Sequence, residues 1–168
     1  MSAGRVLVAG IGNIFLSDDG FGVETLRRLR EHPLPPAVEL LDVGVRGVHL
    51  AYQVLDGYRL LVLVDATARG GEPGTVYLIE PEAGPVEELV MDGHRMGPDS
   101  VLALLGTLAA GTDGSPPERV LVVGCEPQSL AEGIGLSAPV AAAVEEAVRL
   151  VLEVVGAEAP VEREASRW

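Results

Sequence analysis

The chain has 168 residues, of which 48% are hydrophobic, and carries a formal net charge of -13 at pH 7. This length and content predict one domain with a sizeable core and argue against intrinsic disorder. Nucleic acids and anionic membrane surfaces attract proteins through basic patches, so the acidic balance argues against both as partners. The single cysteine, Cys125, excludes an internal disulfide and fits a reducing compartment. Without a cleavable leader pattern or an apolar run of about 18 residues, the sequence predicts a cytoplasmic protein.

Apolar runs alternate with helical patterns along the chain. The runs predict strands over residues 5–9, 38–42, 58–64, 75–79 and 118–123. The helical patterns predict helices over residues 22–31, 44–55, 98–108 and 137–155. The connection between residues 58–64 and 75–79 is too short for a crossover helix. We therefore expect residues 75–79 to pair antiparallel at an edge of the sheet.

This alternation predicts the α/β class of fold. We expect a three-layer α/β/α sandwich whose mostly parallel sheet has about five strands, one of them an antiparallel edge strand. Residues 1–155 form the predicted single domain, and the polar residues 156–168 form a predicted C-terminal tail.

A glycine-punctuated loop links the first predicted strand to the first predicted helix. It begins at Gly10, ends at Gly22, and carries Asn13 and the acidic pair Asp18 and Asp19. In an open α/β sheet such a junction lies at the carboxyl end of a strand, where ligands bind. The acids have a simpler explanation as residues of a turn and a first helical turn, where the helix dipole stabilises them. Asn13 is expected to bond its own backbone in a turn, and a ligand contact is the alternative.

The start of this loop partly matches a dinucleotide-binding fingerprint. Gly10 and Gly12 have the required spacing, but Phe15 occupies the position of the third glycine. A phenylalanine there is expected to block close packing of the helix, and the acids that follow would repel a pyrophosphate. The sequence therefore argues against nucleotide binding.

Two further polar residues could join this loop in a site. Asp65 follows the predicted central strand, and His94 lies in a loop between Gly93 and Gly97. Two carboxylates and a histidine are ligands that suit zinc or nickel. Their spacing along the chain is not that of a known metal motif, and loop histidines are common surface residues. From the residues alone, a metal site and ordinary surface positions both stay open.

The other candidate ligands and nucleophiles fit structural roles better. His32 lies in a proline-rich helix end, and His49 falls inside a predicted helix. Cys125 follows a core strand and has no histidine assigned as its base, so we interpret it as a buried small residue rather than a nucleophile. The chain contains no Gly-x-Ser-x-Gly elbow and no His-Glu-x-x-His motif.

Taken together, these motifs resemble those of the hydrogenase maturation endopeptidases, which trim the C-terminus of the nickel-iron hydrogenase large subunit. The resemblance covers roughly residues 4–155. The matching segments are residues 10–13, 17–22, 42–44, 63–66, 73–74, the loop around His94 and residues 123–127.

The resemblance implies a three-layer α/β/α fold and three side chains that contact metal, namely Asp19, Asp65 and His94. The family carries Glu or Asp at the first of these positions, and this chain has Asp. It also implies an aspartic-type peptidase with no tightly held metal of its own. The nickel belongs to the precursor, and another divalent cation could replace it in vitro. Cleavage then acts as a checkpoint, because the tail is removed only after nickel insertion.

The leading hypothesis is an endopeptidase that removes the C-terminal extension of a nickel-iron hydrogenase large-subunit precursor. Asp19, Asp65 and His94 would hold the scissile bond beside the precursor's nickel, which could polarise the carbonyl or lower the pKa of a water. Alternatively, the nickel only docks the precursor and a carboxylate acts as general base. Two rival classes stay open: a non-catalytic maturation chaperone or docking module with the same fold, and a hydrolase with its own zinc.

Overall fold

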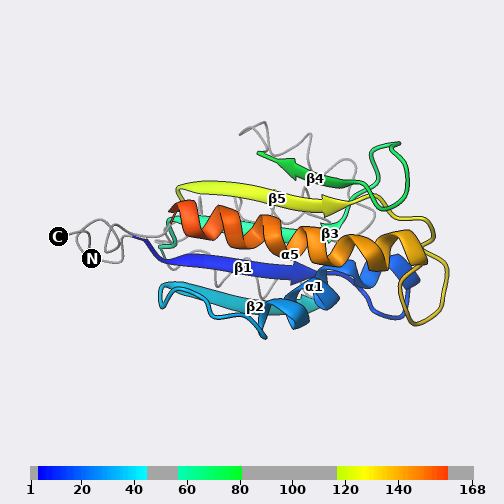
Figure 1. Cartoon of the computed structure of the whole chain (residues 1–168), viewed down its shortest axis with the longest axis horizontal. Coiled ribbons are helices and arrows are strands. Elements are labelled where there is room, and N and C mark those ends of the chain that lie inside the picture. Colours follow the sequence, from blue (N-terminus) through cyan, green and yellow to red (C-terminus); the bar gives the residue numbers. More distant parts are fainter. Residues whose placement is uncertain (1–3, 45–56, 81–116, 159–168) are drawn as a thin grey trace, which may run out of the picture.

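The structure is a computed structural model, and it describes residues 4–44, 57–80 and 117–158. Five strands form one sheet in the order β2-β1-β3-β5-β4 (Figure 1). Their bounds are β1 Val6–Ile11, β2 Val38–Gly44, β3 Leu60–Ala66, β4 Val76–Ile79 and β5 Arg119–Cys125. β1 pairs in parallel with β2 and β3, β3 pairs in parallel with β5, and β4 pairs antiparallel with β5. The predicted mostly parallel sheet with an antiparallel edge strand is therefore confirmed.

Two central strands run further toward their carboxyl ends than their apolar runs predicted. Asp65 pairs with Gly124 and Ala66 pairs with Cys125, so the ladder between β3 and β5 continues past the aliphatic residues. Asp65 and Cys125 therefore lie inside their strands, whereas the sequence placed both of them after a strand. The prediction was wrong here because pairing depends on the backbone of the neighbouring strand, which side-chain hydropathy does not report.

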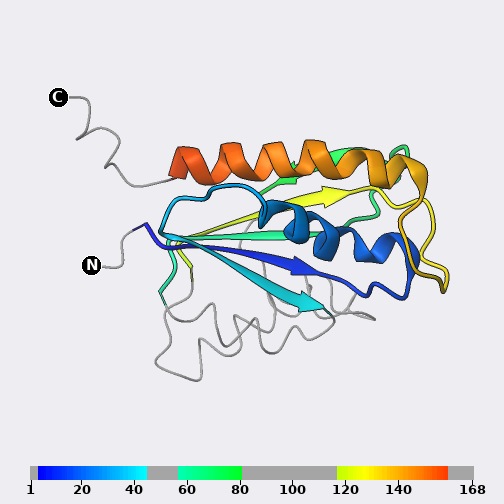
Figure 2. The same cartoon turned by 60° about the horizontal axis from the view of Figure 1, so that its bottom comes forward.

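Both described α-helices cover the same face of the sheet (Figure 2). α1 spans Phe21–Leu29, α5 spans Ala138–Glu158, and the two helices contact each other. A single turn of 3-10 helix, η1 (Ser17–Gly20), precedes α1 and was not predicted. α5 continues past residue 155 into the segment predicted as a tail. The helices predicted over residues 44–55 and 98–108 lie outside the described residues.

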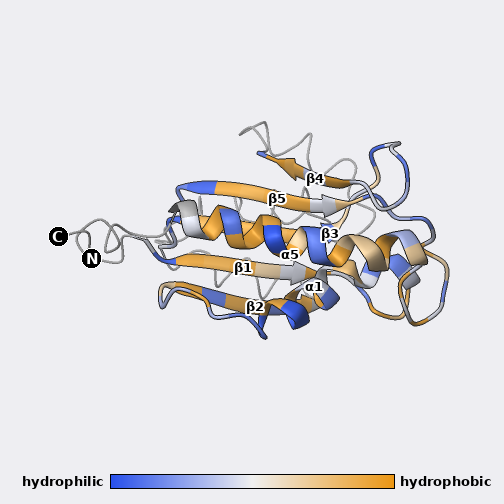
Figure 3. Ribbon diagram, viewed as in Figure 1, coloured by the Kyte–Doolittle hydropathy of each residue, from blue (hydrophilic) through white to orange (hydrophobic). Residues whose placement is uncertain are grey.

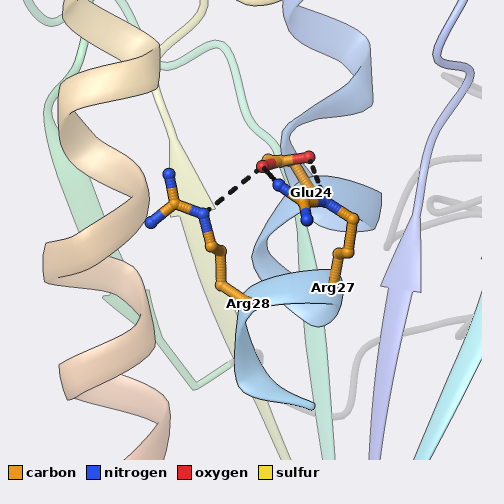
Figure 4. Close-up of polar contacts among 3 residues, drawn as sticks. All are labelled: Glu24, Arg27 and Arg28. Atoms are coloured by element: carbon orange, nitrogen blue, oxygen red, sulfur yellow. Dashed lines mark hydrogen bonds and ion pairs between the residues drawn. The ribbon is translucent and has the colours of Figure 1, made fainter. Parts of the chain in front are cut away.

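Packing against the sheet holds α1 in place. Leu26 and Leu29 have no exposed surface and belong to the core cluster on this face. Glu24 accepts a hydrogen bond from Arg27 Nε at 3.0 Å, and its carboxylate lies 3.5 Å from Arg28 Nε (Figure 4). Such surface pairs stabilise a helix by only about 0.2–0.5 kcal/mol each. The apolar contacts, rather than these ion pairs, therefore decide the position of α1.

Apolar side chains are buried on both faces of the sheet. Val8 and Val62 belong to the cluster beneath α1 and α5. Alternate residues of the same strands form a second buried cluster, which includes Leu7, Ala9, Leu61 and Leu63. Figure 3 shows the hydrophobic residues that run along these central strands. Successive strand side chains point to opposite faces, so the sheet carries buried side chains on both faces, in agreement with a three-layer α/β/α sandwich. In the described part of the chain, no helix has the length and apolarity needed to cross a membrane.

Gly22 lets α1 pack directly onto the ends of β1 and β3. A Cβ atom at this position would collide with the carbonyl oxygen of Val64 and lie 2.5 Å from that of Ile11. In a dinucleotide fingerprint the third glycine, at the position of Phe15, allows the helix to pack closely on the sheet. In this chain Gly22 allows that close packing instead. The expectation that Phe15 blocks the helix is wrong, because the loop before η1 leaves its side chain 59% exposed.

Gly22→Ala is expected to lower the free energy of unfolding by about 2 kcal/mol, because the new methyl group meets rigid backbone on two strands. Urea unfolding followed by circular dichroism measures the change. Gly156→Ala in α5 is the control, since no described atom lies within 4 Å of a Cβ at that position. Alanine there should leave stability unchanged or raise it. Equal stability of Gly22→Ala and the wild type would contradict the close packing.

Candidate active site

The switch point of the sheet lies between β1 and β3. The chain passes from β1 to β2 on one side, whereas β3 is followed by strands on the other side. Ligands of open α/β sheets bind outside the carboxyl ends of the strands at such a point. The segment after β1 carries Asp19, and β3 carries Asp65 near its carboxyl end. Two of the three predicted site residues therefore lie at the switch point.

Gly12 lies between these two aspartates. Its φ of 141° is in the region that favours glycine, and a Cβ atom here would collide with the Asp19 carbonyl oxygen. The same Cβ position is 3.7 Å from Asp65 Oδ1. The backbone of Asp19 and the carboxylate of Asp65 therefore approach one small space beside Gly12, which a side chain would fill.

Backbone N–H groups orient both carboxylates. Asp19 Oδ2 accepts a hydrogen bond from Asn13 N at 2.8 Å, and Asp65 Oδ1 accepts one from Ala66 N at 2.8 Å. Asn13 Oδ1 in turn accepts from Phe15 N at 2.9 Å, which confirms the predicted turn. Asp65 is 4% exposed, whereas Asp19 is partly exposed. Asp19 is thus the acid that a substrate reaches more readily.

No histidine among the described residues lies at this site. His94 and His49 lie outside them, so the placement of His94 beside the two acids stays a prediction. His32 is exposed beyond the end of α1, as expected for a surface residue. Among the described residues, no group of three or more His, Cys, Asp or Glu side chains is arranged to hold a metal ion.

Asp18 has a different role from Asp19, which the sequence did not distinguish. Its side chain is fully buried. Asp18 Oδ2 accepts hydrogen bonds from Gln128 N at 2.8 Å, Ser129 N at 3.0 Å and Ser137 Oγ at 2.9 Å, and Oδ1 accepts from Ser137 N at 2.7 Å. Burial opposes ionisation, but these hydrogen bonds outweigh it and hold the pKa of Asp18 below its ordinary value. Asp18 therefore fixes the loop before α5 and does not face a substrate.

Glu126, directly after β5, is a second buried carboxylate held by hydrogen bonds, here mainly from the loop between β3 and β4. Its side chain is 6% exposed, and Oε1 accepts hydrogen bonds from Arg69 N at 2.8 Å, Gly71 N at 3.2 Å and Tyr77 Oη at 2.7 Å. Burial again opposes ionisation, but the bonds from Arg69 and Tyr77 hold the pKa of Glu126 below its ordinary value. The sequence did not reveal this buried acid, because each of these donors lies 49 or more residues away.

Cys125 is a buried structural residue, as the sequence predicted. Its side chain has no exposed surface. Burial, together with the negative charges of Asp18 and Glu126, raises the pKa of the Cys125 thiol to about 12. The thiol therefore stays protonated at neutral pH and is not a nucleophile.

Comparison with known proteins identifies the family. The family model of the hydrogenase maturation proteases matches residues 23–154. The hydrogenase expression/formation protein HoxM of Azotobacter vinelandii is 35% identical over 157 residues, which cover 91% of this chain and 73% of that protein. The hydrogenase 2 maturation protease of Escherichia coli (strain K12) is 32% identical over 150 residues, which cover 88% of each chain. Among solved structures, the hydrogenase maturating endopeptidase HybD of E. coli matches with a TM-score of 0.73 and 32% identity, over 90% of this chain and 91% of that one.

The fold defines an α/β protein with two aspartates at the switch point of its sheet. The chain belongs to the hydrogenase maturation protease family, and it is therefore a peptidase. The resemblance inferred from the sequence motifs and the three-layer fold that it implied are both confirmed.

Asp18→Asn is expected to lower the free energy of unfolding by about 3 kcal/mol at pH 7, because an amide replaces a charge that buried donors surround. Urea unfolding measures the loss. The control is Asp42→Asn at the end of β2, where the side chain is exposed and the change should stay within about 0.5 kcal/mol. Equal effects of the two substitutions would contradict the structural role of Asp18.

The pH dependence of stability tests the ionised state of Asp18. Its pKa in the folded protein lies below the unfolded value of about 3.9. The stabilisation is therefore fully present above that value and is lost as the pH falls through the folded-state pKa. Urea unfolding at a series of pH values should show a steeper loss of stability below about pH 4 in the wild type than in Asp18→Asn. Parallel curves for the two proteins would show that Asp18 is not the titrating group.

Proposed function

We propose that this protein is a cytoplasmic endopeptidase that removes the C-terminal extension of a nickel-iron hydrogenase large-subunit precursor. Membership of the hydrogenase maturation proteases supports the reaction class. The observation that carries the site assignment is that the backbone of Asp19 and the carboxylate of Asp65 approach one space beside Gly12 at the switch point. The single cysteine, which is a buried free thiol, supports a reducing compartment.

The nickel in this proposal is part of the substrate. The precursor carries it, and Asp19, Asp65 and His94 add carboxylate and imidazole ligands, which suit a borderline divalent ion. The geometry of Asp19 supports this role, because within the described chain only its Oδ2 atom accepts a hydrogen bond. The full ligand set forms only when the precursor supplies nickel, so cleavage follows nickel insertion.

The two aspartates have different tasks in the reaction. Asp65 is nearly buried and fixed by Ala66 N, so it is a rigid carboxylate that orients the metal-bearing substrate. Asp19 is more exposed, so its carboxylate is the one that a reacting water beside the nickel can reach. It acts there as an aspartic-type general base, or it orients the water while nickel lowers the pKa of that water.

Incubation with nickel-loaded and nickel-free precursor, followed by measurement of precursor mass, tests the function. We expect the C-terminal extension to be lost only from the nickel-loaded form. Loss from both forms would leave a protease without the nickel checkpoint. Binding without a change in mass would identify a docking module, and stoichiometric zinc retained after dialysis would indicate a hydrolase with its own metal.

Asp19→Asn, Asp65→Asn and His94→Ala should each lower the processing rate by about 100-fold or more, because each removes a group that acts at the reacting centre. Thermal unfolding should show that these variants remain folded. The control is Glu118→Gln, since Glu118 is exposed next to the amino end of β5, and this variant should process the precursor at the wild-type rate. Unchanged processing by the three site variants would refute the site.

A further inference from the structure

Two neighbouring loops next to the candidate active site carry exposed apolar residues. Ile14 is 44% exposed, Phe15 is 59% exposed and Ile134 is 77% exposed. Among the described residues, the other exposed large hydrophobic side chain is Leu78 on the edge strand β4. Large apolar side chains that are exposed together mark interaction surfaces. We refer to Ile14, Phe15 and Ile134 as the apolar patch.

Hydrogen bonds join the two loops that carry the apolar patch. Gly133 N donates to Phe15 O at 2.9 Å, and Ser17 N donates to Gly133 O at 2.8 Å. Ser17 Oγ donates to Ala131 O at 2.6 Å, although 114 residues separate these two positions along the chain. Figures 1 and 2 both show the loop after β1 beside the loop that leads into α5. The apolar patch is therefore a preformed surface.

Two glycines hold Ile134 at the outside of its loop. Gly133 has a φ of 151° and Gly135 has a φ of 110°, both in the region that favours glycine. The backbone turns on either side of Ile134 and leaves its side chain in solvent. The exposure of Ile134 is thus a consequence of the loop conformation.

The apolar patch is continuous with the candidate active site. Ile14 follows Asn13, whose N–H group orients the Asp19 carboxylate. Gly20, on the other side of Asp19, packs so closely that a Cβ atom there would lie 3.2 Å from Ile14 Cα. A polypeptide that places a bond beside Asp19 therefore lies within reach of the patch.

We propose that the apolar patch docks an apolar segment of the precursor polypeptide beside the bond that is cut. This inference rests on the proposed function and adds a recognition surface to it. The net charge of -13 and the exposed Glu132, next to the patch in sequence, disfavour an acidic segment, and the three patch side chains complement an apolar one. The segment contributes apolar contacts while the carboxylates contact the metal.

The size of the apolar patch argues against a second copy of this chain as its occupant. With about 200 Å² for a fully exposed large side chain, the three exposed fractions give the patch about 360 Å². A symmetric contact between two copies would bury roughly twice this area, well below the ~1,200 Å² of a specific stable interface. A substrate segment that is also held at the active site needs no larger contact.

The test compares the double variant Phe15→Ser/Ile134→Ser with the wild type on the nickel-loaded precursor. We expect KM to rise by about 30-fold while kcat stays within about 2-fold, because docking acts on binding rather than on the chemical step. Phe15→Leu/Ile134→Leu keeps the surface apolar and should hold KM within about 3-fold of the wild type. Leu78→Ser removes an exposed apolar side chain from β4 and should leave both constants unchanged.

Each other outcome has a distinct meaning. Wild-type processing with an unchanged KM in the serine variant would overturn the docking surface and leave the proposed function intact. Failure of the wild type to process the precursor would refute the proposed function and, with it, this inference. A wild-type dimer that the serine variant converts to monomers, measured by sedimentation, would make a second copy the occupant and overturn the proposal.

Discussion

A buried carboxylate, that of Asp18, ties the loop after β1 to the loop that leads into α5. A buried charge without partners would cost several kcal/mol, so the surrounding backbone has to supply N–H donors at fixed positions. Ser137 supplies both its N–H group and its hydroxyl immediately before α5, where the helix dipole also favours a negative charge. Asp18 thereby fixes the residues just before α5. Because Asp19 is the next residue, the same hydrogen bonds also hold the backbone of Asp19 in place.

A second buried carboxylate at this edge of the sheet, that of Glu126, likewise requires N–H donors. It accepts hydrogen bonds from backbone N–H groups of the loop between β3 and β4. Two glycines allow backbone segments to pack closely where a side chain would not fit. Gly12 admits the Asp19 carbonyl, and Gly22 admits the ends of β1 and β3. The loops around the switch point are thus held by buried charges and close contacts before any substrate binds. Such preorganisation is what a reaction that depends on precise orientation requires.

In the proposed function, this edge of the sheet offers both carboxylates and apolar contacts to one macromolecular substrate. Asp19 and Asp65 present carboxylates at the switch point, and His94 stays the predicted third ligand. The apolar patch begins at Ile14, directly after Asn13, whose N–H group orients the Asp19 carboxylate. A protease gains selectivity for one precursor when two separate contacts, here the proposed metal contact and the proposed peptide contact, must form together. Hydrogen bonds between the loop after β1 and the loop before α5 hold the apolar patch in a fixed place beside Asp19, as this proposal requires.

The sequence by itself determined the order of strands and helices, since aliphatic runs and helical periodicity report burial locally. It also identified β4 as an antiparallel edge strand, because the short connection excludes a crossover. The residue pattern marked the acids after the first strand and at the end of the central strand, and the family resemblance singled out Asp19 and Asp65 among them. Only the tertiary structure decided that Asp18 is buried while Asp19 is accessible, and that Phe15 faces solvent beside the loop of Ile134. The physical reason is the distance between partners along the chain. Asp18 and Ser137 are 119 residues apart, so no local pattern of hydropathy or charge can report the hydrogen bonds that separate the roles of two adjacent aspartates.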